Sequence, residues 1–198
     1  MINIYDYFEK QRTLDKTIMD KFGTKIDDIV HKQVFAFMVE VGEFANETRV
    51  FKHWSQKAMS PPDVLLDEYA DALHFLLSFS YMYMDAYFPE EPEWLIWEKL
   101  VDFIPAYVID TLNEEDIHDP KDAVLHFLNG CFYLASNLMY PKQETVYSFL
   151  SGLWLSFLAV AYCMNFTLDE IFEAYDKKHE INYARQEANY WWNLLLNN

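Results

Sequence analysis

The stretch that decides the fold reads Glu40-Val-Gly-Glu43, and a second stretch, Glu68-Tyr-Ala-Asp71, follows it further along the chain. In each stretch the acidic residues have i, i+3 spacing, which places both carboxylates on one face of a helix, about one turn apart. Two such pairs on antiparallel helices can direct four carboxylates into one volume. We therefore predict two helices that lie side by side with their acidic turns facing each other.

Apolar residues recur at helical period around both acidic pairs, which is the pattern of helices that bury one face. In the first segment they are Val34, Phe37, Met38, Val41, Phe44 and Ala45, and in the second Leu66, Ala70, Leu73 and Leu77. Either acidic pair alone would be typical of a solvated helix face. The two together, each bordering an apolar stripe, favour a shared site at the edge of the core.

Four carboxylates in one volume repel one another strongly. At ~4 Å and an effective dielectric constant of ~20, each like-charged pair costs about 4 kcal/mol. A cation must therefore lie among them, or some of them must be protonated. Oxygen ligands suit Mg²⁺, with Mn²⁺ as an alternative, and Mg²⁺ usually keeps positions for water and substrate phosphates. The predicted metal ligands are Glu40, Glu43, Glu68 and Asp71.

These motifs resemble those of the dimeric dUTPases, a branch of the MazG-like all-α nucleoside triphosphate pyrophosphohydrolases. The resemblance covers the first helix, residues from about 34 to 78 and residues from about 175 to 190. Its further segments are Gln11-Arg-Thr-Leu14-Asp15, Phe51-Lys52-His53-Trp54-Ser55, Asp67-Glu68-Tyr-Ala-Asp71-Ala-Leu-His74-Phe75 and Lys178…Asn182…Arg185-Gln186. It implies an all-α helical bundle, a homodimer, and Mg²⁺-dependent hydrolysis of dUTP to dUMP and pyrophosphate, with dUDP as a further substrate. Glu43 or Glu40 would orient or deprotonate the attacking water.

The resemblance also implies roles for individual side chains. Gln11 and Asp15 would help recognise uracil, and Trp54, His74 and Phe75 would line the base and sugar pocket. Lys52 and Lys57 would lie near phosphates, and the segment with Lys178, Asn182 and Arg185 would close over the triphosphate.

The residue pattern itself leaves plainer roles open for the same side chains. Lys178, Asn182 and Arg185 have i, i+4, i+7 spacing and so share one helix face, which is either a phosphate-binding face or a salt-bridged surface. Gln11 could be a buried glutamine bonded to a neighbour, and His74 a histidine whose hydrogen bonds are satisfied at the core edge.

Composition narrows the class of protein. The chain of 198 residues has 52% hydrophobic residues, only 4 glycines and a formal charge of -17. Long stretches without turn signals favour helices and one domain over residues 1–198, with about 90–120 as a variable insert or lid. The negative charge disfavours nucleic acid and anionic membranes as partners. Cys131 and Cys163 lie in apolar segments and are expected to be free thiols. No signal peptide opens the chain, so a cytoplasmic location is expected.

Helix boundaries can be placed from caps and breakers. We expect helices over about 2–22, ending at Gly23, over about 27–51, and from Pro61-Pro62 to the break before Pro89. A helix over about 93–112 should be kinked or divided by Pro105, and 113–119 should be an acidic surface loop. The last helix should begin at Thr167, a capping residue with Glu170 three positions on.

The run over about 145–168 contains no Asp, Glu, Lys or Arg and is long enough to cross a bilayer. Its serines and glycine, and flanks without a basic bias, favour a core helix or a subunit interface instead.

Three other functions remain open from the sequence. One is a dCTP or broader nucleoside triphosphate pyrophosphohydrolase of the MazG type. Another is a carboxylate di-iron protein, suggested by Asp71-x-x-His74, although such sites typically use two Glu-x-x-His pairs. The third is a non-enzymatic helical interaction protein with the apolar runs as its partner surface.

Overall fold

The structure, a computed structural model, describes residues 2–90 and 100–187. Within these ranges every regular element is helical and there is no strand, so the predicted all-α fold is confirmed. The elements are α1 (Ile4–Phe22), α2 (Ile26–Thr48), α3 (Pro62–Tyr87), the short 3₁₀ helix η1 (Val101–Phe103), α5 (Ile104–Glu114), α6 (Pro120–Leu138), α7 (Gln143–Cys163) and α8 (Leu168–Glu187).

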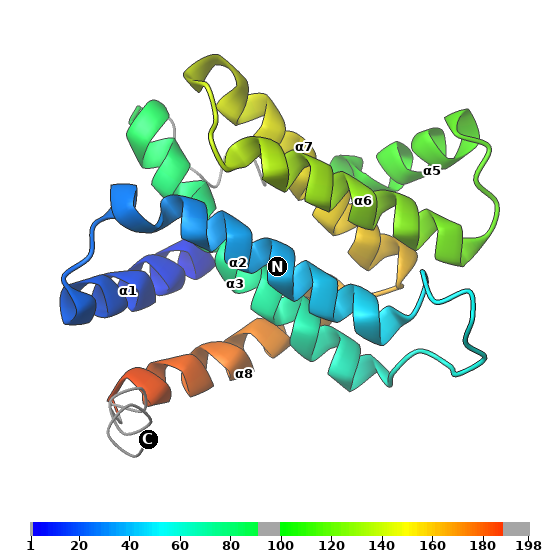
Figure 1. The fold of residues 1–198 in the computed structure, drawn as a ribbon, viewed down its shortest axis with the longest axis horizontal. Helices are drawn as coiled ribbons and strands as arrows, with labels where there is room; N and C mark the ends of the chain where they lie inside the picture. The colour runs from blue at the N-terminus through cyan, green and yellow to red at the C-terminus, as the bar shows by residue number, and fades with distance from the viewer. Residues whose placement is uncertain (1, 91–99, 188–198) are drawn as a thin grey trace.

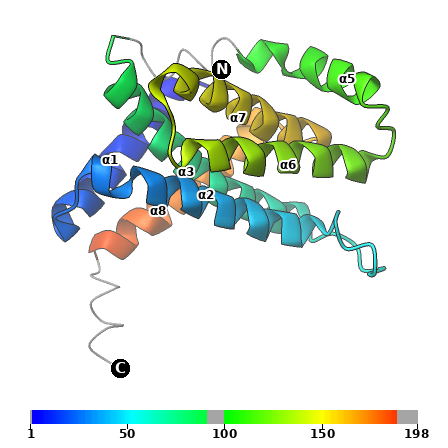
Figure 2. The ribbon, with the colours of Figure 1, turned by 45° about the horizontal axis from the view of Figure 1, so that its top comes forward.

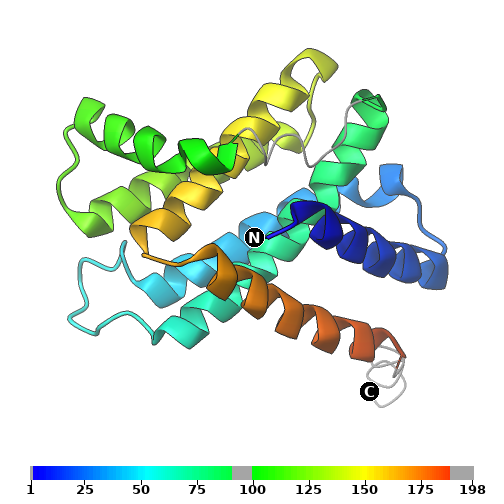
Figure 3. The ribbon, with the colours of Figure 1, turned by 180° about the vertical axis from the view of Figure 1, so that it is seen from behind.

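The antiparallel pair α2–α3 lies at the centre of the bundle (Figure 1). Helix α3 contacts α1, α2, α7 and α8, and α2 also contacts α6. Helices α5, α6 and α7 lie on one side of the pair, and α1 and α8 lie on the other (Figures 1 and 3). The loop between α2 and α3 extends away from the bundle at the end of the pair (Figure 2). The helices that carry the other site residues, α1, α2 and α8, are therefore all positioned by their packing against α3.

Helix ends follow the expected capping chemistry at most positions. Gly23 ends α1 in the left-handed conformation (φ 64°), which glycine adopts without steric cost. At the start of α8, the Thr167 amide donates to Glu170 Oε2 at 2.8 Å, and the Glu170 amide donates to Thr167 Oγ1 at 3.3 Å, which completes the predicted capping box. Pro62 lies in the first turn of α3.

Helix α2 ends earlier than the sequence prediction of Phe51. It ends at Thr48 because Arg49 takes the left-handed conformation (φ 61°) and its amide donates to the Ala45 carbonyl at 3.1 Å. This is a helix stop that glycine usually provides, so the arginine gave no signal for it.

Pro105 lies in the first turn of α5, so it begins a helix after η1, consistent with the predicted division at this proline. The remainder of the expected 93–112 helix includes residues outside the described ranges. The acidic loop begins after Glu114 and ends at Asp119, whose side chain caps α6 by accepting from the Lys121 amide at 2.7 Å.

Aromatic side chains fill the core between the central pair and α7. Tyr69 on α3 stacks on Phe157 with ring centroids 4.1 Å apart and donates its hydroxyl to the Phe157 carbonyl at 2.9 Å. The buried indole of Trp154 donates to Ser80 Oγ at 3.0 Å, so its polar atom is also satisfied. These contacts hold α3, and with it the acidic turn, in a fixed position relative to α7.

The pair α6–α7 depends on a close approach at Gly130. A Cβ atom there would lie 2.7 Å from Ser156 Oγ and 3.3 Å from its Cβ, so a larger residue fits only if Ser156 moves. Helix α7 is long and apolar enough to cross a bilayer, and it is the one such helix among the described residues. Just over half of its most apolar window, 56%, is buried inside the structure, which is also the behaviour of a core helix. Cys131 and Cys163 are free thiols, as expected.

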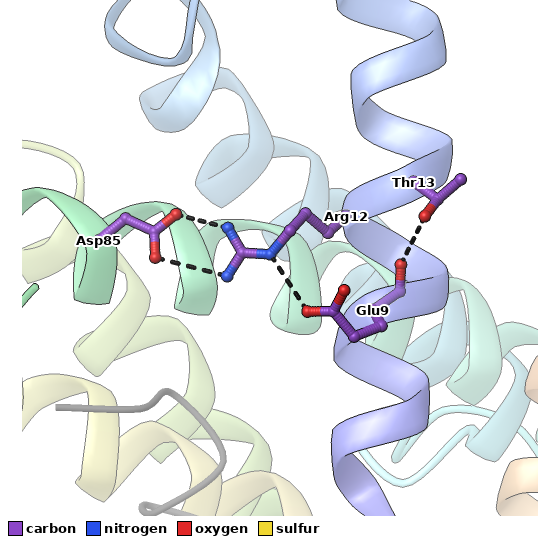
Figure 4. A network of polar contacts seen from close by, with 4 residues as sticks. All are labelled: Glu9, Arg12, Thr13 and Asp85. Atoms are coloured by element: carbon purple, nitrogen blue, oxygen red, sulfur yellow. Dashed lines mark hydrogen bonds and ion pairs between the residues drawn. The ribbon is translucent and has the colours of Figure 1, made fainter.

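Helix α1 is attached to α3 by Arg12. Its guanidinium donates to Asp85 at 2.5 Å and 3.4 Å, and its Nε lies 3.6 Å from Glu9, as Figure 4 shows. The same guanidinium lies over the Tyr81 ring, 4.3 Å from its centroid. These contacts set the position of α1, which carries Gln11 and Asp15.

Candidate active site

Carboxylates from α2 and α3 converge at the centre of the helix pair. One oxygen each from Glu40, Glu68 and Asp71 lies within 4.8 Å of the others, and all three side chains are half-buried. Two helix faces therefore meet at one site, as the i, i+3 spacing predicts for these three residues. An oxygen-only donor set at this separation fits a hard divalent cation such as Mg²⁺.

Glu43 lies one turn along α2 from Glu40 and is exposed. Its carboxylate is not within the converging group, but its charge acts on the group by raising the pKa values of Glu40 and Glu68. Glu43 is thus placed at the solvent side of the cluster, where water has direct access to it.

The electrostatics of the cluster favour protonation when no cation is present. Burial, together with the charges of Asp71, Glu43 and Glu68, raises the pKa of Glu40 to about 7. Burial and the Asp71 charge also raise the pKa of Glu68. Neighbouring like charges have this effect because each ionised carboxylate disfavours ionisation of the next. A divalent cation would relieve the same repulsion.

Lys178 on α8 is the cation that contacts this cluster. Its Nζ lies 2.6 Å from Asp71 Oδ2 and 2.8 Å from Asp67 Oδ2, and its side chain is only 16% exposed. Burial lowers the pKa of Lys178, but its bonds to Asp67 and Asp71 outweigh that effect and raise the pKa above its usual value. For Asp71, burial raises the pKa and the Lys178 bond lowers it, with a net rise. The predicted role of Lys178 at phosphates stays a prediction, because both of its partners in this structure are carboxylates.

The other members of the α8 face follow Lys178 toward the end of the helix. Arg185 Nη1 donates to Asn182 Oδ1 at 3.3 Å, and Arg185 is exposed. Its charge reaches Asp71 and lowers the pKa of that carboxyl. Lys178 thus contacts the cluster, and the charge of Arg185 acts on Asp71 from further along α8.

The loop after α2 is held by arginine and lysine contacts. Arg49 donates to Ser55 Oγ at 2.7 Å, and Lys52 Nζ donates to the Asn46 carbonyl at 3.0 Å. Trp54 is 67% exposed and its ring makes T-shaped contacts with the rings of His53 and Phe51, so it is not a core residue. Lys57 is exposed.

Gln11 and Asp15 belong to a buried hydrogen-bond network that joins α1, α3 and α8. Gln11 Oε1 lies 2.7 Å from His74 Nδ1 and accepts from the Tyr175 hydroxyl at 3.0 Å, while Gln11 Nε2 donates to Asp15 Oδ1 at 2.9 Å. Ser78 Oγ donates to Asp15 Oδ2 at 2.6 Å. Gln11 is thus a buried, satisfied glutamine here, and its predicted contact with a base would require these bonds to exchange.

The network holds its titratable groups in unusual states. Burial, together with the nearby His179, lowers the pKa of His74 to about 3. Burial raises the pKa of Asp15 to about 6, although the Ser78 and Gln11 bonds act in the opposite direction. The His74 ring stacks on Tyr175 with centroids 4.0 Å apart, and its Nε2 has no hydrogen-bond partner among the described residues. His74 is outside the carboxylate group formed by the described residues, so the geometry does not bring together the carboxylate and histidine ligands of a di-iron site.

Phe75 is half-buried and packs against the core beside the acidic face of α3.

Two residues of the site were missed in the sequence. Asp67 lies one turn before Asp71, and this i, i+4 spacing was the available signal for a shared partner. Tyr175 lies one turn before Lys178 on α8, but nothing in its local sequence indicated that it would donate to Gln11.

Comparison with known families matches the chain, over residues 3–190, to the family described as dUTPase. A search of curated proteins finds no match. The family match includes both acidic pairs, the loop with Trp54 and the cationic face of α8. It agrees with the all-α fold and with the motifs that resembled the dimeric dUTPases. The chain therefore belongs to the all-α dUTPase family and is a dUTP diphosphatase.

Proposed function

We propose that this enzyme hydrolyses dUTP to dUMP and pyrophosphate with Mg²⁺, or Mn²⁺ in its place, held by Glu40, Glu43, Glu68 and Asp71. The observation that carries the proposal is the convergence of Glu40, Glu68 and Asp71 oxygens within 4.8 Å. When bound, the metal would supply charge neutralisation for the phosphates and a lowered pKa for a coordinated water.

The two glutamates of the first acidic pair, Glu40 and Glu43, have different roles in this proposal. Glu43 is exposed beside the cluster and so is the better placed of the two first-pair glutamates to orient or deprotonate the attacking water. Glu40, whose pKa is raised to about 7, lies inside the cluster. Because a Glu40 oxygen belongs to the converging group, the role of Glu40 is to hold the cation.

Cationic residues would neutralise the phosphates. Lys178 is at the cluster and Arg185 lies further along the same face of α8, where its planar fork suits phosphate oxygens. Asn182 would donate a hydrogen bond, and Lys52 and Lys57 would approach from the loop after α2.

Base and sugar recognition would use residues on three elements. Exposed Trp54 offers an aromatic face from the loop, and Phe75 offers a partly buried one from α3. Gln11, Asp15 and His74 supply polar groups once their mutual bonds exchange with a uracil edge. A site that satisfies buried polar groups only with uracil would reject cytosine strongly, because those groups would remain unpaired.

The test is release of pyrophosphate from dUTP, dCTP, dTTP and UTP, and of phosphate from dUDP, with Mg²⁺ and with Glu43→Gln as the inactive control. Preferential turnover of dUTP supports the proposal. Preference for dCTP would change the base assignment, and equal turnover of all triphosphates would indicate a broad pyrophosphohydrolase of the MazG type. Release of phosphate from dUDP would add the diphosphate to the substrates.

We further propose that the enzyme works as a homodimer of chains that each form a single domain over residues 1–198, with about 90–120 as a variable insert. The formal charge of -17 disfavours nucleic acid and anionic membranes as partners, and the free thiols of Cys131 and Cys163 fit a reducing cytoplasm. Light scattering of the purified protein tests the dimer, and fractionation of cells tests the location.

A further inference from the structure

Asp67 lies outside the carboxylate group and yet shares its cation. Lys178 Nζ is 2.8 Å from Asp67 Oδ2 and 2.6 Å from Asp71 Oδ2, so one ammonium bridges two carboxylates one turn apart on α3. Only Asp71 is also in the group formed with Glu40 and Glu68. The Asp67 side chain is more than half exposed, whereas that of Asp71 is largely buried. The two carboxylates thus hold Lys178 from the solvent side and from the cluster side.

The bridge cannot stay as it is when Asp71 becomes a metal ligand. A divalent cation beside Asp71 repels the Lys178 ammonium, and Asp71 oxygens committed to the cation are weaker acceptors for it. Lysine is also a flexible side chain with a large rotamer entropy. Without another partner, its ammonium would leave the cluster edge and sample solvent.

We propose that Asp67 is a positioning residue that keeps Lys178 beside the cluster after a cation takes Asp71, so that the ammonium is ready for the substrate's phosphates. This inference rests on the proposed function. Asp67 itself touches neither metal nor substrate. It acts through Lys178, and the predicted consequence is weaker substrate binding without a slower chemical step.

The kinetic test compares Asp67→Ala with Asp63→Ala, which removes an exposed carboxylate one turn earlier on the same helix. For Asp67→Ala we expect the KM for dUTP to rise about three- to fivefold with kcat unchanged, the size of effect of one partly exposed ion pair. Asp63→Ala should change neither. Asp67→Glu, which restores a carboxylate, should recover most of the KM. In a Lys178→Met background, Asp67→Ala should have no further effect on KM, because its partner is absent.

A second measurement uses the metal-free protein without substrate. Acetic anhydride modifies lysine amines, and mass spectrometry gives the rate at Lys178. We expect faster acetylation of Lys178 in Asp67→Ala than in wild type or Asp63→Ala, and an unchanged Mg²⁺ affinity by calorimetry relative to Asp63→Ala.

Equal KM values for Asp67→Ala and Asp63→Ala in an enzyme that turns over dUTP would overturn the inference and leave the proposed function intact. The same holds for a loss confined to kcat, or for an Asp67→Ala effect that persists without Lys178. A wild-type enzyme that does not hydrolyse dUTP would overturn the proposed function, and the inference with it. The acetylation rate would then still report whether the Asp67–Lys178 pair exists.

Discussion

Replacement of Asp15 by asparagine should stabilise the protein at neutral pH and much less in acid. Asp15 is buried, and its pKa in the folded protein is about 6 against an ordinary value of 3.8. Because the folded pKa is the higher one, the stability linked to this carboxyl is fully present below pH 3.8 and is lost as the pH rises through about 6. Asparagine has nearly the same shape, can still accept from Gln11, and never ionises.

The magnitude follows from the two pKa values. Ionised Asp15 costs about 3 kcal/mol of stability at pH 7.5 and about 1.6 kcal/mol at pH 5. The stabilisation by Asp15→Asn should therefore be about 1.4 kcal/mol larger at pH 7.5 than at pH 5. His74 acts in the opposite direction, because its pKa of about 3 makes stability fall as the pH drops below 6.5. That contribution is common to wild type and variant, so it cancels in the comparison.

The assay is urea unfolding of metal-free protein at both pH values, followed by far-UV circular dichroism. Both values stay above the sequence pI of about 4.5, where solubility falls. Asp20→Asn, which removes an exposed carboxylate from the same helix, is the matched control and should show no difference between the two pH values. An Asp15→Asn effect that is equal at pH 5 and 7.5 would refute the reasoning that burial keeps this carboxyl largely protonated below pH 6.

Two further predictions concern packing and the loop. Gly130→Ala should destabilise the protein by about 1–2 kcal/mol through overpacking against Ser156. Ser156→Ala in the same chain removes the Oγ that lies 2.7 Å from the added Cβ and should restore most of the stability. Thermal unfolding measures both, and an unaffected single variant would contradict the close approach of α6 and α7. Trp54→Ala should weaken dUTP binding while leaving the urea midpoint unchanged, because the ring is exposed; a large loss of stability would contradict that placement.

The elements most accessible to prediction were those with local signals. Apolar periodicity located α2 and α3, glycine and threonine caps located the end of α1 and the start of α8, and Pro105 located α5. The i, i+3 spacing of the acidic pairs allowed the convergence of Glu40 with Glu68 and Asp71 to be predicted, because helix geometry fixes which side chains share a face.

The remaining features depend on how separate helices dock. The bond between Gln11 and Tyr175 joins α1 to α8, and periodicity within either helix contains no information about their relative position. The Asp67–Lys178 pair has the same origin. Arg49 ends α2 in a conformation that arginine rarely adopts, so neither its identity nor its neighbours indicated the stop.

The account depends most on a divalent cation held by the converging carboxylates. The measurement that tests it most directly is the rate of dUTP hydrolysis by EDTA-treated enzyme, titrated with Mg²⁺, for wild type and for Asp71→Asn. The account predicts no turnover without Mg²⁺ and saturable recovery of the rate in wild type. In Asp71→Asn the Mg²⁺ concentration for half-maximal recovery should be at least tenfold higher, which corresponds to about 1.4 kcal/mol for the loss of one charged ligand. Full turnover in EDTA, or equal Mg²⁺ titrations of the two proteins, would contradict it.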